Sequence, residues 1–135
     1  MSWQAYVDSS LVGSGHIDKA CIVSAAGDST WATTPDFQVK PEELKAIVAV
    51  LNEPDKTNGA PVVTAYSEGL HVAGERFVAT RVEDRHIYGR KEKTGICIVK
   101  TKQTILIGHY GENVQAGNAT QTVEALADYL INVGY

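Results

Sequence analysis

Apolar residues recur along this chain at two spacings, one typical of helices and one typical of strands. Val7 and Leu11 lie four residues apart, which places them on one face of a helix. Ser2 precedes them and is a favourable N-cap residue, because its hydroxyl can accept a hydrogen bond from a first-turn N–H. The pattern therefore predicts a first helix over residues 3–12, ended by the glycines that follow.

Two further helices are predicted from similar signals. The stretch Lys40-Pro41-Glu42-Glu43 suits a helix start, since proline fits the first helical position and glutamates complement the positive end of the helix dipole. This helix is expected to end near Asn52. Asn118 and Gln121 have the spacing of a capping box at the start of a last helix. The apolar face of that helix would consist of Val123, Leu126, Leu130 and Val133.

Between these helices the pattern is that of strands joined by short polar turns. Residues 20–24 and 30–33 form a predicted hairpin that presents Trp31. The connection over residues 53–68 contains two prolines and is the least regular part, where residues 62–66 are a weak candidate for an edge strand. Beyond it the separators are short and permit only antiparallel neighbours, so a meander is predicted. Its strands cover residues 70–72, 76–81, 86–90, 95–99 and 104–109.

This order of elements predicts one α+β domain over residues 1–135. A central antiparallel sheet would carry the N- and C-terminal helices on one face and shorter helical or loop elements on the other. A chain of 135 residues with 44% hydrophobic residues can bury a core. No apolar run is long enough for a membrane span, and no secretory leader is recognised. Cys21 and Cys97 lie in apolar runs, which favours buried free thiols over a disulfide.

The net charge of −4 conceals an uneven distribution. Residues 76–102 hold eight of the twelve basic residues and three of the sixteen acidic ones, so this window carries +5 and the remainder −9. Such a window is typical of a docking face for an anionic partner, but it is also what solvated hairpin turns produce. Both interpretations stay open at this point.

The chain shows no recognisable catalytic pattern. The histidines, at positions 16, 71, 86 and 109, are far apart and lack metal-ligand spacing, and neither cysteine belongs to a Cys-x-x-Cys pair. The acidic pairs Glu42-Glu43 and Glu83-Asp84 are explained by a helix start and a turn. No metal, no cofactor and no enzymatic activity are therefore expected, and a binding protein is favoured.

Aromatic residues gather at the two ends of the chain and in the first hairpin. Trp3 and Tyr6 lie three residues apart on one face of the first helix. If both terminal helices pack on one face of the sheet, the residues Trp3, Tyr6, Trp31, Tyr129 and Tyr135 can meet. An exposed groove of this composition suits a polyproline II ligand, whose rings stack on aromatic faces. The alternative is that these aromatic residues belong to the core and anchor the termini.

Several motifs follow one another along nearly the whole chain. They are Ser2-Trp3-Gln4-Ala5-Tyr6-Val7-Asp8, Asp18-Lys19-Ala20, Gly27-Asp28 with Trp31-Ala32-Thr33, residues 85–90, residues 100–104 and residues 123–131. In order and spacing these motifs resemble those of the profilin family, and in particular its fungal members. The departure from the fungal sequences is a longer connection between Pro54 and Gly69.

The resemblance implies a monomeric cytoplasmic protein of the cytoskeleton and cell cortex. It would bind monomeric actin, proline-rich segments of formin-like assembly factors, and phosphoinositide headgroups on an anionic membrane surface. The implied proline-rich site comprises Trp3, Tyr6, Trp31, Tyr129, Leu130 and Tyr135. The implied actin site comprises Arg76, Val78, Arg81, Arg85, Arg90, Gln115, Gly117, Thr120, Gln121 and Glu124. The implied phosphoinositide site comprises Arg81, Arg85, Arg90 and Lys91.

Two other classes of function compete with this one. A small-molecule sensor domain of similar layout would enclose an apolar ligand cavity and would not turn its tryptophans to solvent. A binder of nucleic acid or of anionic surfaces in general would rest on the basic window alone. The chain is acidic overall and lacks a nucleic-acid motif, so no nucleic-acid partner is expected.

Overall fold

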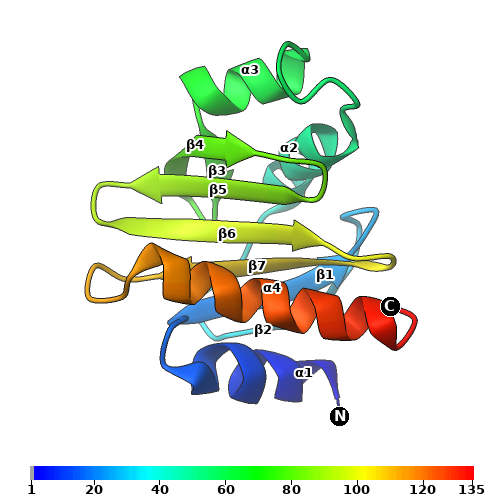
Figure 1. Cartoon of the computed structure of the whole chain (residues 1–135), viewed down its shortest axis with the longest axis vertical. Helices are drawn as coiled ribbons and strands as arrows, with labels where there is room; N and C mark the ends of the chain where they lie inside the picture. Colours follow the sequence, from blue (N-terminus) through cyan, green and yellow to red (C-terminus); the bar gives the residue numbers. More distant parts are fainter. Residues whose placement is uncertain (1) are drawn as a thin grey trace.

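A computed structural model describes residues 2–135 and contains one seven-stranded antiparallel sheet, with strand order β2-β1-β7-β6-β5-β4-β3 (Figure 1). The predicted hairpin and meander are confirmed. The meander runs from β3 to β7, and β1 then pairs with β7, so the first hairpin completes the sheet at one edge. The strands are β1 (Lys19–Ser24), β2 (Thr30–Thr33), β3 (Leu70–Val72), β4 (Glu75–Val82), β5 (His86–Lys91), β6 (Thr94–Lys100) and β7 (Thr104–Tyr110).

The first helical segment begins as predicted but does not keep one pitch. The Ser2 hydroxyl accepts the Ala5 N–H at 3.1 Å and caps α1 (Trp3–Ala5). The chain then continues through the π-helical segment η1 (Tyr6–Leu11) into the 3₁₀ turn η2 (Val12–Ser14). Gly15, at a φ of 82°, ends the segment in a left-handed conformation that glycine adopts without strain.

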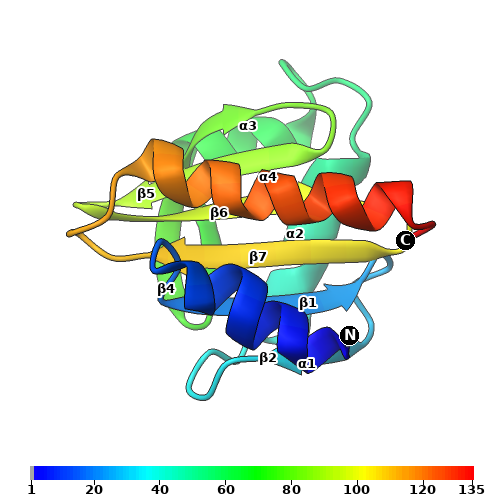
Figure 2. The ribbon, with the colours of Figure 1, turned by 60° about the horizontal axis from the view of Figure 1, so that its bottom comes forward.

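Helices cover both faces of the sheet, as predicted. The segment from α1 to η2 and the last helix, α4 (Ala116–Asn132), lie together on one face, here called the terminal-helix side (Figure 2). The helices α2 (Pro41–Asn52) and α3 (Ala60–Ser67) lie on the other, the α2–α3 side. Each side has its own core of fully buried residues, with Val7, Leu11 and Leu130 on the first and Ile47 and Val62 on the second.

The start of α2 is fixed to the sheet by a buried glutamate. The Glu43 carboxylate accepts the Lys40 N–H at 2.7 Å, the Ala73 N–H at 3.1 Å and the Gly74 N–H at 2.9 Å. Ala73 and Gly74 form the β3–β4 turn, and both have positive φ, as in the tight turns that match strand twist. Complementing the helix dipole is thus only part of what Glu43 does.

The prediction of an edge strand over residues 62–66 is wrong, because this stretch lies within α3. Pro61 occupies the first turn of that helix, where its missing N–H costs nothing. Val62 and Ala65 are three residues apart and both fully buried, so the helical spacing sends them into the core. β-Branched composition alone suggested a strand, and tertiary packing overrides that preference.

The predicted capping of the last helix is also wrong. α4 begins at Ala116, Gln115 is the N-cap residue, and no side chain provides a cap hydrogen bond. Asn118 lies inside the first turn, where its carbonyl accepts the Thr122 hydroxyl at 2.9 Å. The apolar face is confirmed for Val123, Leu126 and Leu130, but Val133 follows the last helical residue and is exposed.

The remaining composition-based expectations concern cysteines and membranes. Cys21 and Cys97 are free and buried, as predicted. They lie in different cores, Cys21 on the α2–α3 side and Cys97 on the terminal-helix side. No helix within residues 2–135 has the length and apolar character needed to cross a bilayer.

Candidate functional site

The five aromatic residues that the sequence singled out meet on the terminal-helix side. Trp3 is central: its ring centroid lies 4.9 Å from that of Trp31, 5.0 Å from that of Tyr135 and 5.6 Å from that of Tyr6. Tyr6 in turn lies 6.2 Å from Tyr129. These distances are those of interacting aromatic pairs. We call Trp3, Tyr6, Trp31, Tyr129 and Tyr135 the aromatic surface.

The aromatic surface is partly packed and partly accessible. Trp31, Tyr129 and Tyr135 are 36%, 50% and 42% exposed, whereas Trp3 and Tyr6 are half-buried against the terminal-helix core. Partial burial and the neighbouring Tyr129 hydroxyl raise the pKa of the Tyr6 phenol. Both sequence interpretations therefore apply: Trp3 and Tyr6 anchor the first helix, and the cluster still presents aromatic faces to solvent.

Two elements from different parts of the chain are joined next to Trp3. The Gln4 side-chain amide donates to the Thr33 carbonyl at 3.0 Å, and its oxygen accepts the Thr33 N–H at 3.4 Å. Thr33 belongs to β2, the edge strand that carries Trp31. The Gln4 amide thus pairs with the backbone N–H and C=O that the edge strand leaves without a neighbouring strand, and this holds α1 beside β2. This pairing brings Trp3 against Trp31.

Leu130 does not belong to the surface of this cluster. Its side chain is 0% exposed and packs in the terminal-helix core with Val7 and Leu11. Its backbone carbonyl accepts the Tyr135 N–H at 2.8 Å, which holds Tyr135 close to the end of α4. The resemblance placed Leu130 among the peptide-binding residues, but the structure gives it a supporting position beneath them.

A second candidate surface lies on the same side of the sheet, where α4 leaves β4 and β5 uncovered (Figure 1). Strand alternation and the registers of Val78 with Arg90 and of Arg81 with Tyr88 direct these residues to one face. Arg76 belongs to the same face by alternation, and its guanidinium donates to the Glu68 carbonyl at the end of α3. We call Arg76, Val78, Arg81, Tyr88 and Arg90, with the first half of α4, the strand face.

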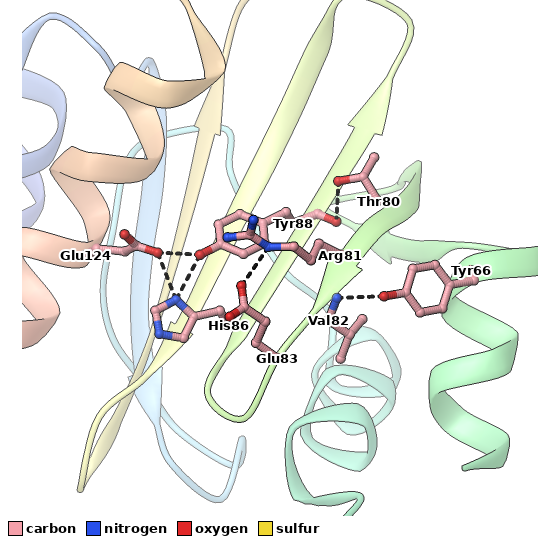
Figure 3. Close-up of polar contacts among 8 residues, drawn as sticks. All are labelled: Tyr66, Thr80, Arg81, Val82, Glu83, His86, Tyr88 and Glu124. Carbon is pink, nitrogen blue, oxygen red and sulfur yellow. Dashed lines mark hydrogen bonds and ion pairs between the residues drawn. The ribbon is translucent and has the colours of Figure 1, made fainter. Parts of the chain in front are cut away.

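A polar cluster joins α4 to β5 in the middle of the strand face (Figure 3). The Tyr88 hydroxyl donates to the Glu124 carboxylate, and Nδ1 of His86 lies 2.8 Å from the same oxygen. Burial and the hydrogen bond to Glu124 raise the pKa of Tyr88, so its hydroxyl stays a donor. The cluster fixes the position of Glu124 relative to the strands.

Arg81 lies against this cluster and is already partly neutralised. Its guanidinium carbon is 4.7 Å from the centroid of the Tyr88 ring, and its Nε is 2.6 Å from Glu83 Oε1 (Figure 3). A cation over an aromatic face is attracted by the ring quadrupole. An anionic ligand at Arg81 would therefore compete with Glu83 for the guanidinium.

The structure brings together some of the predicted residues and separates others. Gln115, Gly117 and Gln121 are exposed at the start of α4, and Thr120 and Glu124 are half-buried beside the strands. Arg85 lies in the β4–β5 turn, at the opposite end of β5 from Arg90. Lys91 follows Arg90 and so faces the other side of the sheet, where its Nζ lies 3.6 Å from Glu75 Oε1. Lys91 is therefore not part of the strand face.

Sequence reasoning missed His86 and Tyr88 as residues of this surface. Tyr88 precedes Arg90 by two positions on one strand, so period-two alternation places both on the same face. That signal was available for Tyr88. Both residues pair with Glu124, which lies 36 residues after Tyr88 and 38 residues after His86. No local sequence pattern reveals contacts over such a separation.

A cleft of about 590 Å³ lies on the α2–α3 side, between α2, α3 and β3. Small and apolar residues such as Ala46, Ala49 and Pro61 line it. Its buried acidic residue, Glu43, already accepts three backbone N–H groups. Residues 2–135 also hold no cluster of potential metal ligands. The Glu43 carboxylate is therefore already engaged by backbone donors in this cleft.

The antiparallel sheet with helices on both faces is an α+β fold, and the chain was compared with known proteins. The profilin family model matches residues 1–135. The profilin of Saccharomyces cerevisiae is 47% identical over 135 residues, covering 100% of both chains. A crystal structure of Schizosaccharomyces pombe profilin has a TM-score of 0.89 at 45% identity and covers 99% of this chain and 100% of that one.

The chain therefore belongs to the profilin family, a family of actin-binding, non-enzymatic proteins that regulate actin assembly. The fold extends to more distant structures. A structure of mouse profilin IIa in complex with a double repeat from the FH1 domain of mDia1 has a TM-score of 0.76, at 20% identity and full coverage of both chains.

Proposed function

We propose that this protein binds proline-rich segments on the aromatic surface and monomeric actin on the strand face, at the same time. The observation that carries the proposal is that two surfaces of different chemistry lie on one side of the sheet without sharing a residue. A ligand on one would leave the other free. The protein would thereby deliver actin to proline-rich assembly factors and would perform no chemistry of its own.

The proline-rich ligand suits the chemistry of the aromatic surface. Polyproline II helices present rings that stack on aromatic faces and free carbonyls that accept hydrogen bonds. Trp31, Tyr129 and Tyr135 offer accessible ring faces, and tyrosine hydroxyls and the indole N–H can donate to the ligand's carbonyls. The complex of the mouse relative with FH1 repeats supports this choice of ligand. Leu130 contributes by supporting Tyr135.

The actin site would combine the arginines of β4 and β5 with the first half of α4. Arg76, Arg81 and Arg90 give it positive charge, and Glu124 adds an acidic position next to them. The other proposed contributors are Val78, Arg85, Gln115, Gly117, Thr120 and Gln121. Such a mixture of charged, amide and small residues suits a polar interface with a large protein partner.

Phosphoinositide headgroups would bind to the same arginines and would compete with actin. Arg81, Arg85 and Arg90 are the candidates, because guanidinium groups recognise phosphate in a bidentate manner. Lys91 lies on the other side of the sheet and forms an ion pair with Glu75, so it contributes only to the general potential. We further propose that the protein is a monomer that acts in the cytoplasm and at the cell cortex.

Separate loss of the two ligands tests the proposal. Trp3→Ala should weaken binding of a proline-rich peptide by about 30-fold or more, since central aromatic residues are typical hot spots. Its affinity for monomeric actin should stay within about twofold. Titration of peptide and of actin, each with purified protein, measures both. Equal loss of both ligands would indicate a shared site or an unfolded variant.

The converse variant is Arg81→Glu, with Lys45→Glu as the matched control. Arg81→Glu should weaken actin binding by about tenfold, because charge reversal opposes a complementary partner. Lys45 is exposed on α2, on the other side of the sheet, and carries the same charge change. Wild-type actin affinity of Arg81→Glu, or an equal loss in the control, would contradict the placement of the actin site.

A further inference from the structure

The last residues of the chain are attached to the β6–β7 turn. The Thr101 hydroxyl donates to the backbone oxygen of Tyr135 at 2.8 Å, and the Gln103 N–H donates to the same oxygen at 2.5 Å. The Gln103 side-chain amide donates to the Gly134 carbonyl at 3.0 Å. The Tyr135 N–H is used by Leu130, so the donor and the acceptor of Tyr135 are both fixed. Terminal residues usually fray unless they are tied in this way.

Thr101 makes this contact from inside the β6–β7 turn. It is buried, and its oxygen accepts the Thr104 N–H at 3.1 Å and lies against the Thr104 hydroxyl. A threonine hydroxyl has one proton. The Thr104 carbonyl, at 3.4 Å, is a second acceptor within reach of this proton, but the Tyr135 oxygen at 2.8 Å is closer. When the Thr104 hydroxyl donates to Thr101, the proton of Thr101 points to Tyr135.

The same turn also holds the hairpin that carries Trp31. The Gln103 carbonyl accepts the Ala25 N–H at 2.9 Å, directly after β1. One turn thus connects the β1–β2 hairpin with the end of the chain. The Trp3 ring lies between the two, 4.9 Å from Trp31 and edge-on to Tyr135 at 86°.

We propose that residues 101–103 are a positioning element for recognition of proline-rich segments. Thr101 and Gln103 touch no ligand; they hold Tyr135 edge-on to Trp3, so that one wall of the aromatic surface exists before the ligand arrives. Recognition that needs no ordering step on binding is tighter. The proposal rests on the proposed function of the aromatic surface.

The first test compares two substitutions at Thr101. Thr101→Val keeps the shape and removes the hydroxyl, whereas Thr101→Ser keeps the hydroxyl. Titration with a decaproline peptide, followed by tryptophan fluorescence, should show about fivefold weaker binding for Thr101→Val and nearly wild-type binding for Thr101→Ser. Actin affinity should be unchanged in both. Wild-type peptide affinity of Thr101→Val, or equal loss in both variants, would overturn the proposal.

A double-mutant cycle with Tyr135→Ala separates positioning from general destabilisation. If Thr101 acts through Tyr135, Thr101→Val should have no further effect on peptide affinity once Tyr135→Ala is present. An undiminished effect in that background would overturn the proposal. If Tyr135→Ala alone binds the peptide normally, this proposal fails, whereas Trp3→Ala still tests the aromatic surface itself.

A second route covers the case that Thr101→Val does not fold. Gln103 is exposed, and Gln103→Ala removes the bond to the Gly134 carbonyl while its backbone bonds remain. We expect about twofold weaker peptide binding. The neighbouring exposed Lys102→Ala is the control and should have no effect. Equal affinities of Gln103→Ala and Lys102→Ala would count against the positioning role.

Discussion

The two sides of the sheet are built differently, although each has a core of similar character. On the terminal-helix side the helices are held by aromatic packing and by two polar side chains. Gln4 of α1 binds the edge strand β2, and Glu124 of α4 binds β5. On the α2–α3 side, Glu43 binds three backbone N–H groups at the junction of α2 with the β3–β4 turn. Both proposed sites lie on the terminal-helix side.

This difference suggests a division between ligand binding and stability. Trp31, Tyr129 and Tyr135 of the aromatic surface and the guanidinium groups of the strand face stay accessible, and exposed groups contribute little to the stability of the fold. The α2–α3 side buries its charged anchor, Glu43. Substitutions on that side should therefore change the free energy of unfolding without changing ligand affinity, and surface substitutions on the other side should do the reverse.

The largest expected effect concerns the two cysteines, one in each core. Burial raises the pKa of Cys21 and of Cys97 to about 12, from an ordinary value of 9.0. The thiolate fraction in the folded chain is then about a thousandfold lower, and thiolate is the reactive form. We expect almost no labelling by a thiol reagent at pH 8 in the native protein and two thiols labelled in denaturant. Rapid labelling of either cysteine would show that its side of the sheet opens readily.

The same thiols give the stability a pH dependence at alkaline pH. A group whose pKa is raised by folding stabilises the fold fully below its unfolded pKa, and this contribution is lost as pH rises through the folded value. For these thiols the window runs from pH 9.0 to about 12. Denaturant midpoints measured across this window should fall with pH. Cys21→Ala and Cys97→Ala should each reduce the fall.

The next largest effect distinguishes core from ligand contact on the terminal-helix side. Leu130→Ala should lower the free energy of unfolding by about 2–5 kcal/mol, because it leaves a cavity in a fully packed core. Leu51→Ala, also buried but on α2, is the matched variant on the other side and should cost a similar amount. Chemical denaturation measures both. Normal stability of Leu130→Ala with loss of peptide binding would instead make Leu130 a direct ligand contact.

A smaller effect is expected where α2 is attached. Glu43→Gln keeps the shape but replaces charge-assisted hydrogen bonds and turns an amide donor toward backbone N–H groups. The expected cost is about 1.5–3 kcal/mol, with unchanged affinity for peptide and actin. Glu42→Gln, the exposed neighbour in the same helical turn, should cost less than about 0.5 kcal/mol. Equal losses of unfolding free energy in the two variants would mean that Glu43 stabilises the protein through the helix dipole and not through its bonds to the β3–β4 turn.

How much the sequence predicted also differs between the two sides. The strands and the terminal helices followed from periodicity and turn residues, which act over a few positions. The meeting of Trp3 with Trp31 was expected only on the condition that both terminal helices pack on one face of the sheet. The α3 helix was missed because Val62 and Val63 favour strands locally, and burial of Val62 decides the outcome. The bonds of Glu43 to the β3–β4 turn span 30 and 31 residues, beyond any local pattern.

The site residues show the same limit. Resemblance to a family supplied the basic residues as one set, and strand alternation then divides them, with Arg90 on the strand face and Lys91 behind it. For Leu130 the resemblance and the helical spacing disagreed: the resemblance placed it in the peptide site with Tyr129, whereas its spacing from Leu126 placed it on the apolar face, where it is fully buried.

The smallest expected effect concerns the β5–β6 turn, where stability can be changed without a contact in either core. Glu92 has a φ of 55°, a left-handed conformation that strains a residue with a Cβ atom. Glu92→Gly removes the strain but gives the unfolded chain more freedom, so the net gain should be about 0.5 kcal/mol. Lys93, the next turn residue, is not in this conformation, and Lys93→Gly should be destabilising by a similar amount. Thermal midpoints that move in opposite directions would confirm the strain, and a decrease in both would show that it is absent.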